Sequence, residues 1–158
     1  MPTFTIQIDA PPEAVFDEIS RVERHPSWAN PIAKMEMEQT TGDGPGLGSH
    51  YVSHAIFVRK PVSADIDITK YEPPTVFALK ATQHQQGKED SWIEHTFTLT
   101  PSDGGTKVTK HMTGEASVGA AIIGFLAYPA IKKDAMTSLG NLKQMIESTA
   151  STGGTVSG

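Results

Sequence analysis

The sequence predicts an α+β domain in which a curved antiparallel sheet of six to seven strands grips a long C-terminal helix, with two short helices after the first strand. Three observations lead to this prediction. A strand-like segment opens the chain and the double proline Pro11-Pro12 follows it. A long run of alternating, strand-like segments comes next, and one apolar segment at residues 119–146 closes the chain with helical spacing. A sheet wrapped around one helix encloses apolar space, which is where small-molecule sites form.

The first strand and the two short helices are predicted from the first 30 residues. Within residues 3–9 every second side chain is apolar, which is the period of a strand: Phe4, Ile6 and Ile8. Pro11 suits the first position of a helix, where a backbone N–H would have no partner. The buried stripe of that helix is expected to be Val15, Phe16 and Ile19. A second short helix or turn over residues 22–28 is expected to end before Pro31, because proline restricts the residue that precedes it.

Six further segments alternate like strands and are separated by glycine- and proline-rich turns. The strands are predicted at Ile32–Glu38, Ser49–Val58, Val62–Tyr71, Val76–Thr82, Ser91–Thr100 and Thr106–Glu115. Residues 42–46, Pro73-Pro74 and Asp103-Gly104-Gly105 are the clearest turns, and the last predicts a hairpin.

The C-terminal helix is apolar almost all round in its first half, residues 116–131, so we expect that half to be buried on more than one side. Pro129 is predicted to kink the helix or to split it. We place the domain at residues 1–147. Residues 148–158 are rich in Ser, Thr and Gly and are expected to form a disordered tail.

Composition narrows the functional classes. The chain has 158 residues, which fits one domain, and no cysteine, which excludes disulfides and thiol catalysis. A net charge of −5 with scattered basic residues argues against nucleic acid as a partner. The longest uncharged stretch, residues 116–131, is shorter than the roughly 20 residues that a membrane span needs. No secretory signal is recognisable, so a cytoplasmic location is expected.

Four segments in order carry a resemblance to a known family: IDAPPEAVFDEIS, ERHPSWA, YEPPTVFAL and FTLTPSDGGTKVT. Over residues 3–147 the chain resembles the polyketide cyclase/dehydrase-like branch of the START-like (SRPBCC) superfamily. The resemblance implies the helix-grip fold, with a cavity between the helix and the concave face of the sheet. It also implies a hydrophobic ligand, such as a lipid, sterol, polyketide, plant hormone or quinone, and no cofactor. A minority of such proteins catalyse cyclisation or dehydration.

Strand phasing selects three candidate catalytic residues. His95 shares a face with Ile93, Phe97 and Leu99, so it is predicted to point into the apolar interior, where it could orient a ligand carbonyl or move a proton. His54 shares a face with Val52 and Ile56 and is the second candidate. Lys110 shares a face with Val108 and Met112; it either pairs with a ligand carboxylate or enolate or reaches outward. Each has an alternative interpretation as an ordinary structural residue.

Other side chains are expected to line the cavity: Trp28, Met35, Met37, Val52, Ile56, Ile66, Phe97, Val108, Met112, Ile122, Phe125 and Tyr128. Trp28 has a second interpretation, which its burial propensity favours: it packs the short helices onto the sheet. His50 and His54 do not predict a metal site, because four residues of strand span roughly 13 Å, which is too far for one ion. Asp65 and Asp67 alternate away from the apolar face and indicate a solvated side of the sheet.

Three functions remain open at this point. The favoured hypothesis is binding of a lipid-like, aromatic or polyketide-like small molecule. The first alternative is a metal-independent cyclase or dehydratase that uses His, Lys or Tyr side chains of the cavity. The second is an interaction module with a filled cavity, in which the apolar helix mediates partner binding or a homodimer.

Overall fold

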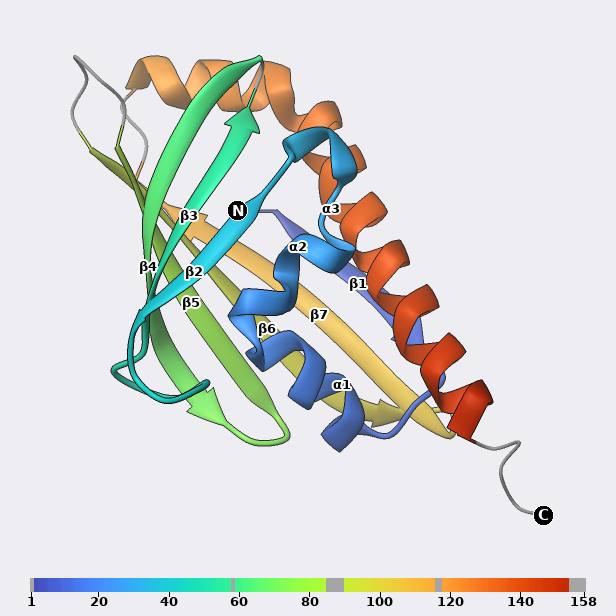
Figure 1. Cartoon of the computed structure of the whole chain (residues 1–158). Helices are drawn as coiled ribbons and strands as arrows, with labels where there is room; N and C mark the ends of the chain where they lie inside the picture. The colour runs from blue at the N-terminus through green and yellow to red at the C-terminus, as the bar shows by residue number, and fades with distance from the viewer. Residues whose placement is uncertain (1, 58, 85–89, 116–117, 154–158) are drawn as a thin grey trace.

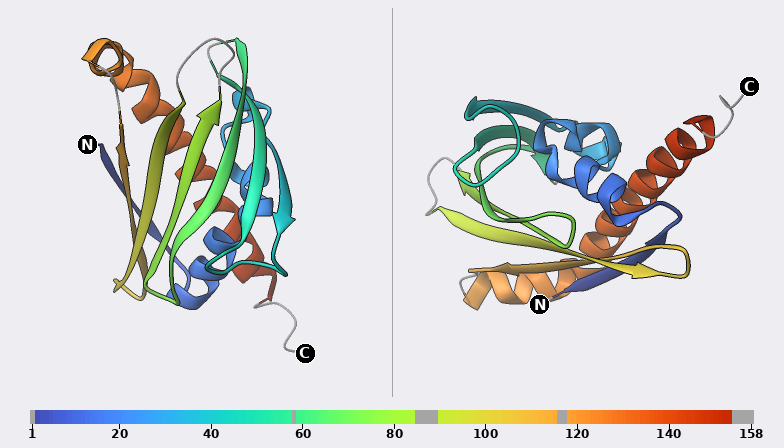
Figure 2. Two further views of the ribbon diagram at one scale, coloured as in Figure 1. Left: turned by 90° about the vertical axis from the view of Figure 1, so that its left-hand side faces the viewer. Right: turned by 90° about the horizontal axis from the view of Figure 1, so that it is seen from below.

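The computed structural model describes the backbone of residues 2–57, 59–84, 90–115 and 118–153, and the side chains of these residues except 57, 118–125 and 151–153. Seven strands form one antiparallel sheet in the order β1-β7-β6-β5-β4-β3-β2. Their bounds are β1 Thr3–Ile8, β2 Glu36–Thr41, β3 His50–Phe57, β4 Lys60–Glu72, β5 Val76–His84, β6 Ser91–Ser102 and β7 Gly105–Gly114. The sheet curls strongly, and the helices lie on its concave side (Figures 1 and 2).

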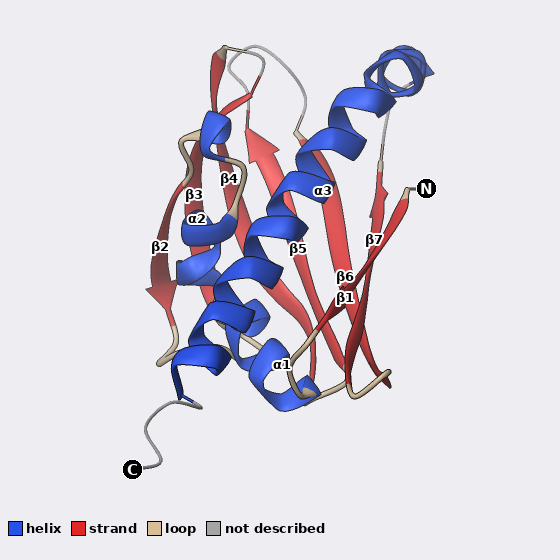
Figure 3. Ribbon diagram, turned by 90° about the vertical axis from the view of Figure 1, so that its right-hand side faces the viewer, coloured by secondary structure: helices blue, strands red, loops and turns tan. Residues whose placement is uncertain are grey.

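The segment between β1 and β2 forms four short helical elements: α1 Pro12–Ser20, η1 Val22–Arg24, α2 His25–Trp28 and η2 Pro31–Ala33. Pro12 begins α1, and the carbonyl of Pro11 accepts from the N–H groups of Ala14 and Val15. The predicted stripe of Val15, Phe16 and Ile19 is buried. These elements therefore close the part of the concave face that the long helix leaves open (Figure 3).

The C-terminal helix α3 runs from Val118 to Gly153 as one 36-residue element with Pro129 inside it. It is not split at Pro129, and its axis changes direction within the portion coloured orange (Figure 1). Its apolar stripe in the second half packs on the sheet through Ala135, Leu139, Leu142 and Ile146. The helix continues six residues beyond the expected domain end at 147. Residues 154–158 of the expected tail lie outside the described part of the chain.

Polar contacts hold the second half of α3 to the start of the chain. The backbone N–H of Asp9 donates to Oε1 of Glu147 at 2.8 Å, and Nζ of Lys143 donates to the carbonyl of Gln7 at 2.8 Å. The backbone N–H of Asn30 donates to the hydroxyl of Ser138 at 3.0 Å. The position of α3 over the sheet is thus fixed by hydrogen bonds at its edges as well as by its apolar stripe.

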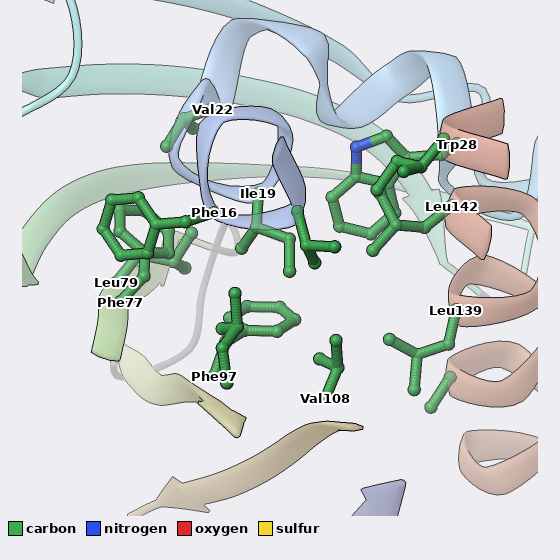
Figure 4. Packing of buried hydrophobic residues seen from close by; sticks show 14 of the residues in the cluster. Phe16, Ile19, Val22, Trp28, Phe77, Leu79, Phe97, Val108, Leu139 and Leu142 are labelled. Atoms are coloured by element: carbon green, nitrogen blue, oxygen red, sulfur yellow. The ribbon is translucent and has the colours of Figure 1, made fainter. Parts of the chain in front are cut away.

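The hydrophobic core lies between the sheet, α1, α2 and the second half of α3. Figure 4 shows Phe97 and Val108 rising from the sheet towards Ile19 and Trp28 of the short helices and Leu139 and Leu142 of α3. Aromatic edge contacts join Phe16 to Phe77 with ring centroids 6.3 Å apart. The predicted fold class, helix-grip α+β, is confirmed by this architecture.

Candidate functional site

Two polar side chains lie on the inner face of β6 and β7. In the register of these strands His95 pairs with Met112, Phe97 with Lys110, and Leu99 with Val108. Phe97, Leu99 and Val108 are buried in the core, so His95 and Lys110 share the inward face, as the phasing predicted. They are diagonal neighbours, which places their Cβ atoms within about 8 Å of each other.

His95 and Lys110 are only half-buried, whereas Phe97 on the same face is 2% exposed. Within the described part of the chain, no hydrogen bond or ion pair occupies either polar group. The nearest recorded partner of Nζ of Lys110 is the Phe97 ring, whose centroid lies 5.6 Å away. Both groups are therefore free to accept a further hydrogen-bond partner, either water or an oxygen-bearing ligand.

Burial governs the protonation of both groups. It lowers the pKa of Lys110 to about 8, while the carboxylate of Asp134 on α3 opposes this shift. Burial also lowers the pKa of His95 well below its ordinary value, and the charges of Lys110 and then His25 add to the effect. At neutral pH the pair therefore consists of a neutral imidazole beside a weakly stabilised ammonium.

His25 of α2 lies close enough to this pair for their charges to influence one another, and the Trp28 ring packs against His25. Their rings are 4.6 Å apart, and Nε2 of His25 donates to the carbonyl of Ile19 at 2.7 Å. Burial lowers the pKa of His25 to about 4; the bond to Ile19 opposes the shift and the charge of Lys110 adds to it. The carbonyl can only accept, so the neutral ring carries its proton on Nε2.

Two buried donors form no hydrogen bond of good geometry among the described residues: Nε1 of Trp28 beside His25, and Oη of Tyr51, which has as its neighbour the side chain of Ser49, just before β3. Trp28 is 4% exposed and Tyr51 is fully buried. Burial, with a contribution from Glu23, raises the pKa of Tyr51, so the hydroxyl keeps its proton at neutral pH. Both are hydrogen-bond donors that an oxygen-bearing ligand or a water molecule would satisfy.

The predicted inward face of β3 is wrong, because the side chains that point inward are shifted by one residue along the strand. Tyr51 and Ser53 are buried, whereas His54 is exposed and Ile56 is 38% exposed. Val52 pairs with Asp65, and His50 on the same face bonds Asp67 through Nδ1 at 2.9 Å. Because paired residues share a face, the solvated carboxylates of β4 set the outer face of β3. His54, Val52 and Ile56 therefore do not line the interior.

The remaining predicted lining residues divide into three groups. Ile66, Phe97, Val108 and Trp28 are buried in the core, and Met37 and Met112 are partly buried against it. Met35 is half-buried just before β2, and Tyr128 is 44% exposed on α3, which does not favour the ligand contact predicted for it. The side chains of Ile122 and Phe125 lie outside the described residues.

Sequence reasoning missed the contributions of His25, Tyr51 and Asp134. His25 and Asp134 come from helices that cross the sheet, and their electrostatic effect on Lys110 depends on tertiary packing. The signal for Tyr51 was present in the chain, because the outward carboxylates of β4 determine which side chains of the paired β3 point inward.

The described ranges contain no group of three or more His, Asp or Glu side chains placed to hold a metal ion. In the same part of the chain, no helix is long and apolar enough to cross a membrane.

A seven-stranded sheet closed around a C-terminal helix, with polar groups on the inner face, defines the helix-grip, START-like class of proteins. The sequence profile described as polyketide cyclase/dehydrase and lipid transport matches residues 3–147, and the chain belongs to that family. No curated protein sequence matches the chain significantly.

Solved structures share the fold at low sequence identity. A conserved protein from Geobacillus kaustophilus aligns with a TM-score of 0.71 at 18% identity, covering 93% of this chain and 95% of the other. Protein Ms6760 from Mycobacterium smegmatis aligns with a TM-score of 0.66 at 18% identity, over 93% and 90% of the two chains. Protein TTHA0849 from Thermus thermophilus gives 0.67 at 18% identity, over 93% and 97%. These similarities concern the fold alone.

Proposed function

We propose that the protein binds a hydrophobic small molecule between the sheet and α3, and that an oxygen of this molecule contacts Lys110 and His95. The observation that carries the proposal is the pair of inward-facing polar groups that lack partners within the described chain. The apolar side chains around them would contribute most of the affinity.

The chemistry of the pair limits the ligand. A neutral imidazole can donate or accept one hydrogen bond, and an ammonium only donates. The unpartnered indole N–H of Trp28, whose ring lies beside that of His25, adds a further position where an oxygen would be favoured. The best match is a largely apolar molecule that carries several oxygens, as lipid-like and polyketide-like compounds do.

Native mass spectrometry of the purified protein, followed by the same measurement after denaturation, tests the proposal. A discrete mass that is lost on denaturation is the expected result. A thermal-shift screen of lipid-like and polyketide-like compounds covers the case in which the ligand is lost during purification, since a bound ligand raises the melting temperature.

A matched pair of variants locates the site. Lys110→Met removes the inward ammonium, and Lys107→Met removes an exposed one from the same strand. Loss of a hydrogen bond to a charged group costs about 1.5–3 kcal/mol, so Lys110→Met is expected to weaken binding roughly 10- to 100-fold while Lys107→Met leaves it unchanged. Equal binding by both variants, or no binding of any compound by the folded protein, would overturn the proposal.

A further inference from the structure

The surroundings of Lys110 favour a neutral, nucleophilic amine over a permanent ion pair. The charged or titratable groups that face it are His95 from β6, His25 from α2 and Asp134 from α3. Both imidazoles are neutral at pH 7, and no described carboxylate lies within 4 Å of Nζ. Asp134 is exposed, so water screens its charge. The positive charge of the ammonium is thus stabilised mainly by the face of the Phe97 ring.

An amine in this position has an unusually large neutral fraction. With a pKa of about 8, roughly a tenth of Lys110 carries no proton at pH 7. Two other lysines of the chain have contacts different from those of Lys110. Lys143 forms an ion pair with Glu147, and Lys80 lies over the Trp92 ring. Desolvation in an apolar pocket is one of the recognised ways to activate a lysine for attack on a carbonyl carbon.

We propose that Lys110 captures the carbonyl group of a bound aldehyde, ketone or 1,3-diketone as an imine, with His95 transferring the protons. The inference rests on the proposed function, because it requires a ligand at the same site. It adds that the ligand carries an electrophilic carbonyl and that binding includes a reversible covalent step.

The step balances without any oxidant or reductant. Nζ of neutral Lys110 attacks the carbonyl carbon, a C–N bond forms, and the electron pair of the C=O bond moves to oxygen. His95 takes one proton from the nitrogen and delivers it to that oxygen, which gives a carbinolamine. It then transfers the second nitrogen proton to the same oxygen, which leaves as water when the C–O bond breaks and the C=N bond forms. The products are one imine and one water. With a 1,3-diketone, transfer of a proton from the carbon between the carbonyls to the nitrogen converts the imine to a conjugated enaminone.

The position of His95 suits this transfer. It is the diagonal neighbour of Lys110 on the inner face, and no described residue occupies either ring nitrogen. Burial keeps the ring neutral and able to accept a proton. The resulting imidazolium is strongly acidic there, so it returns the proton readily to the departing oxygen.

The test uses the full chain and 2,4-pentanedione, a small 1,3-diketone whose enaminone with lysine is detected by near-ultraviolet absorbance and by intact mass. Peptide mapping then locates the adduct. The expected result is one addition of the diketone minus water at Lys110, formed about 100-fold faster at pH 7 than on exposed lysines. The rate is expected to rise with pH and level off above about 8, following the pKa of Lys110.

Three variants separate the roles of the Lys110 amine, the His95 imidazole and the exposed lysine on the other face of β7. Lys110→Arg keeps the positive charge but cannot form the imine, so the fast adduct should disappear; Lys107→Met on the opposite face of β7 should leave it unchanged. His95→Gln should slow adduct formation at least tenfold, because a glutamine side chain can form a hydrogen bond with the carbonyl but cannot take up and return a proton.

The outcomes distinguish this inference from the function on which it rests. Suppose that a compound binds the parent protein but not Lys110→Met, while the diketone labels Lys110 no faster than the exposed lysines. The proposed binding function would then be supported and imine formation would be overturned. Absence of both binding and selective labelling overturns both.

Discussion

Replacing Lys110 with methionine is expected to stabilise the protein near neutral pH, because the variant removes a poorly compensated ammonium from the interior. Methionine keeps the length and apolar character of the lysine stem. Burial lowers the pKa of Lys110 from 10.5 to about 8, and each unit corresponds to about 1.4 kcal/mol. The penalty for the charge is therefore about 3 kcal/mol. The variant also loses the contact between the ammonium and the Phe97 ring, which costs about 1 kcal/mol. The free energy of unfolding should therefore rise by about 2 kcal/mol.

The pH dependence identifies the cause of the gain. A lysine whose pKa is lowered in the folded state binds its proton more weakly there than in the unfolded chain. The penalty is therefore complete below pH 8, falls as the pH rises above 8, and is nearly gone at pH 10.5. Urea unfolding at pH 7 and pH 9.5 should show the advantage of the variant shrinking by about 2 kcal/mol.

Lys107→Met is the matched control, since Lys107 is exposed on the same strand. Its free energy of unfolding should stay within about 0.5 kcal/mol of the parent protein at both pH values. If the effect of Lys110→Met is the same at pH 7 and pH 9.5, or if the variant is destabilised at pH 7, the electrostatic reasoning is wrong and the lysine stabilises through its contacts.

Four further stability predictions can be checked by the same unfolding experiments. Thr106→Val should cost about 1–3 kcal/mol, because the fully buried hydroxyl donates to the carbonyl of Ala10 at 2.8 Å and the variant leaves that carbonyl unpaired; a cost below about 0.5 kcal/mol would contradict this. Gly105→Ala should cost about 1–3 kcal/mol, since an added Cβ would overlap the carbonyl oxygen of Ile8. Gly140→Ala on α3 should instead stabilise by up to about 1 kcal/mol, because its Cβ meets nothing within 4 Å; equal signs for the two glycines would refute the packing argument. Tyr51→Phe should leave stability unchanged or slightly higher, because the hydroxyl makes no hydrogen bond of good geometry; a loss above about 1 kcal/mol would show that it bonds the neighbouring Ser49.

The inward orientation of His95 and Lys110 could be predicted from sequence because β6 and β7 alternate clearly. Only one choice of inward face buries the large apolar side chains of both strands, which are Phe97 and Leu99 on β6 and Val108 on β7. Long strands with large apolar residues on one face are strongly specified, since a slip of one residue would expose that entire face.

The phase of β3 could not be read from its own residues. The strand HYVSHAIF carries apolar side chains on both faces, so alternation alone does not decide between them. The decision comes from pairing with β4, where Asp65 and Asp67 must face water. The wrong phase thus occurs in the strand whose own pattern is ambiguous.

The site residues from the helices were less predictable for a different reason. Trp28 and His25 belong to short elements whose position depends on how they cross the sheet, and periodicity within four residues specifies no direction. The helix α3 was predicted correctly as one long element, but which of its residues approach Lys110 depends on the bend and on its hydrogen bonds to β1.

Those hydrogen bonds between α3 and β1 also determine when the chain can fold during synthesis. Asp9 and Glu147 are 138 residues apart, and Gln7 and Lys143 are 136 apart, so the contacts that close the domain join its two ends. β1 itself pairs with β7, the last strand of the sheet. A ribosome-bound chain therefore displays the apolar concave face until nearly all of it has been translated, and contacts of such long sequence separation form slowly. Until then the nascent chain presents the kind of surface that chaperones recognise.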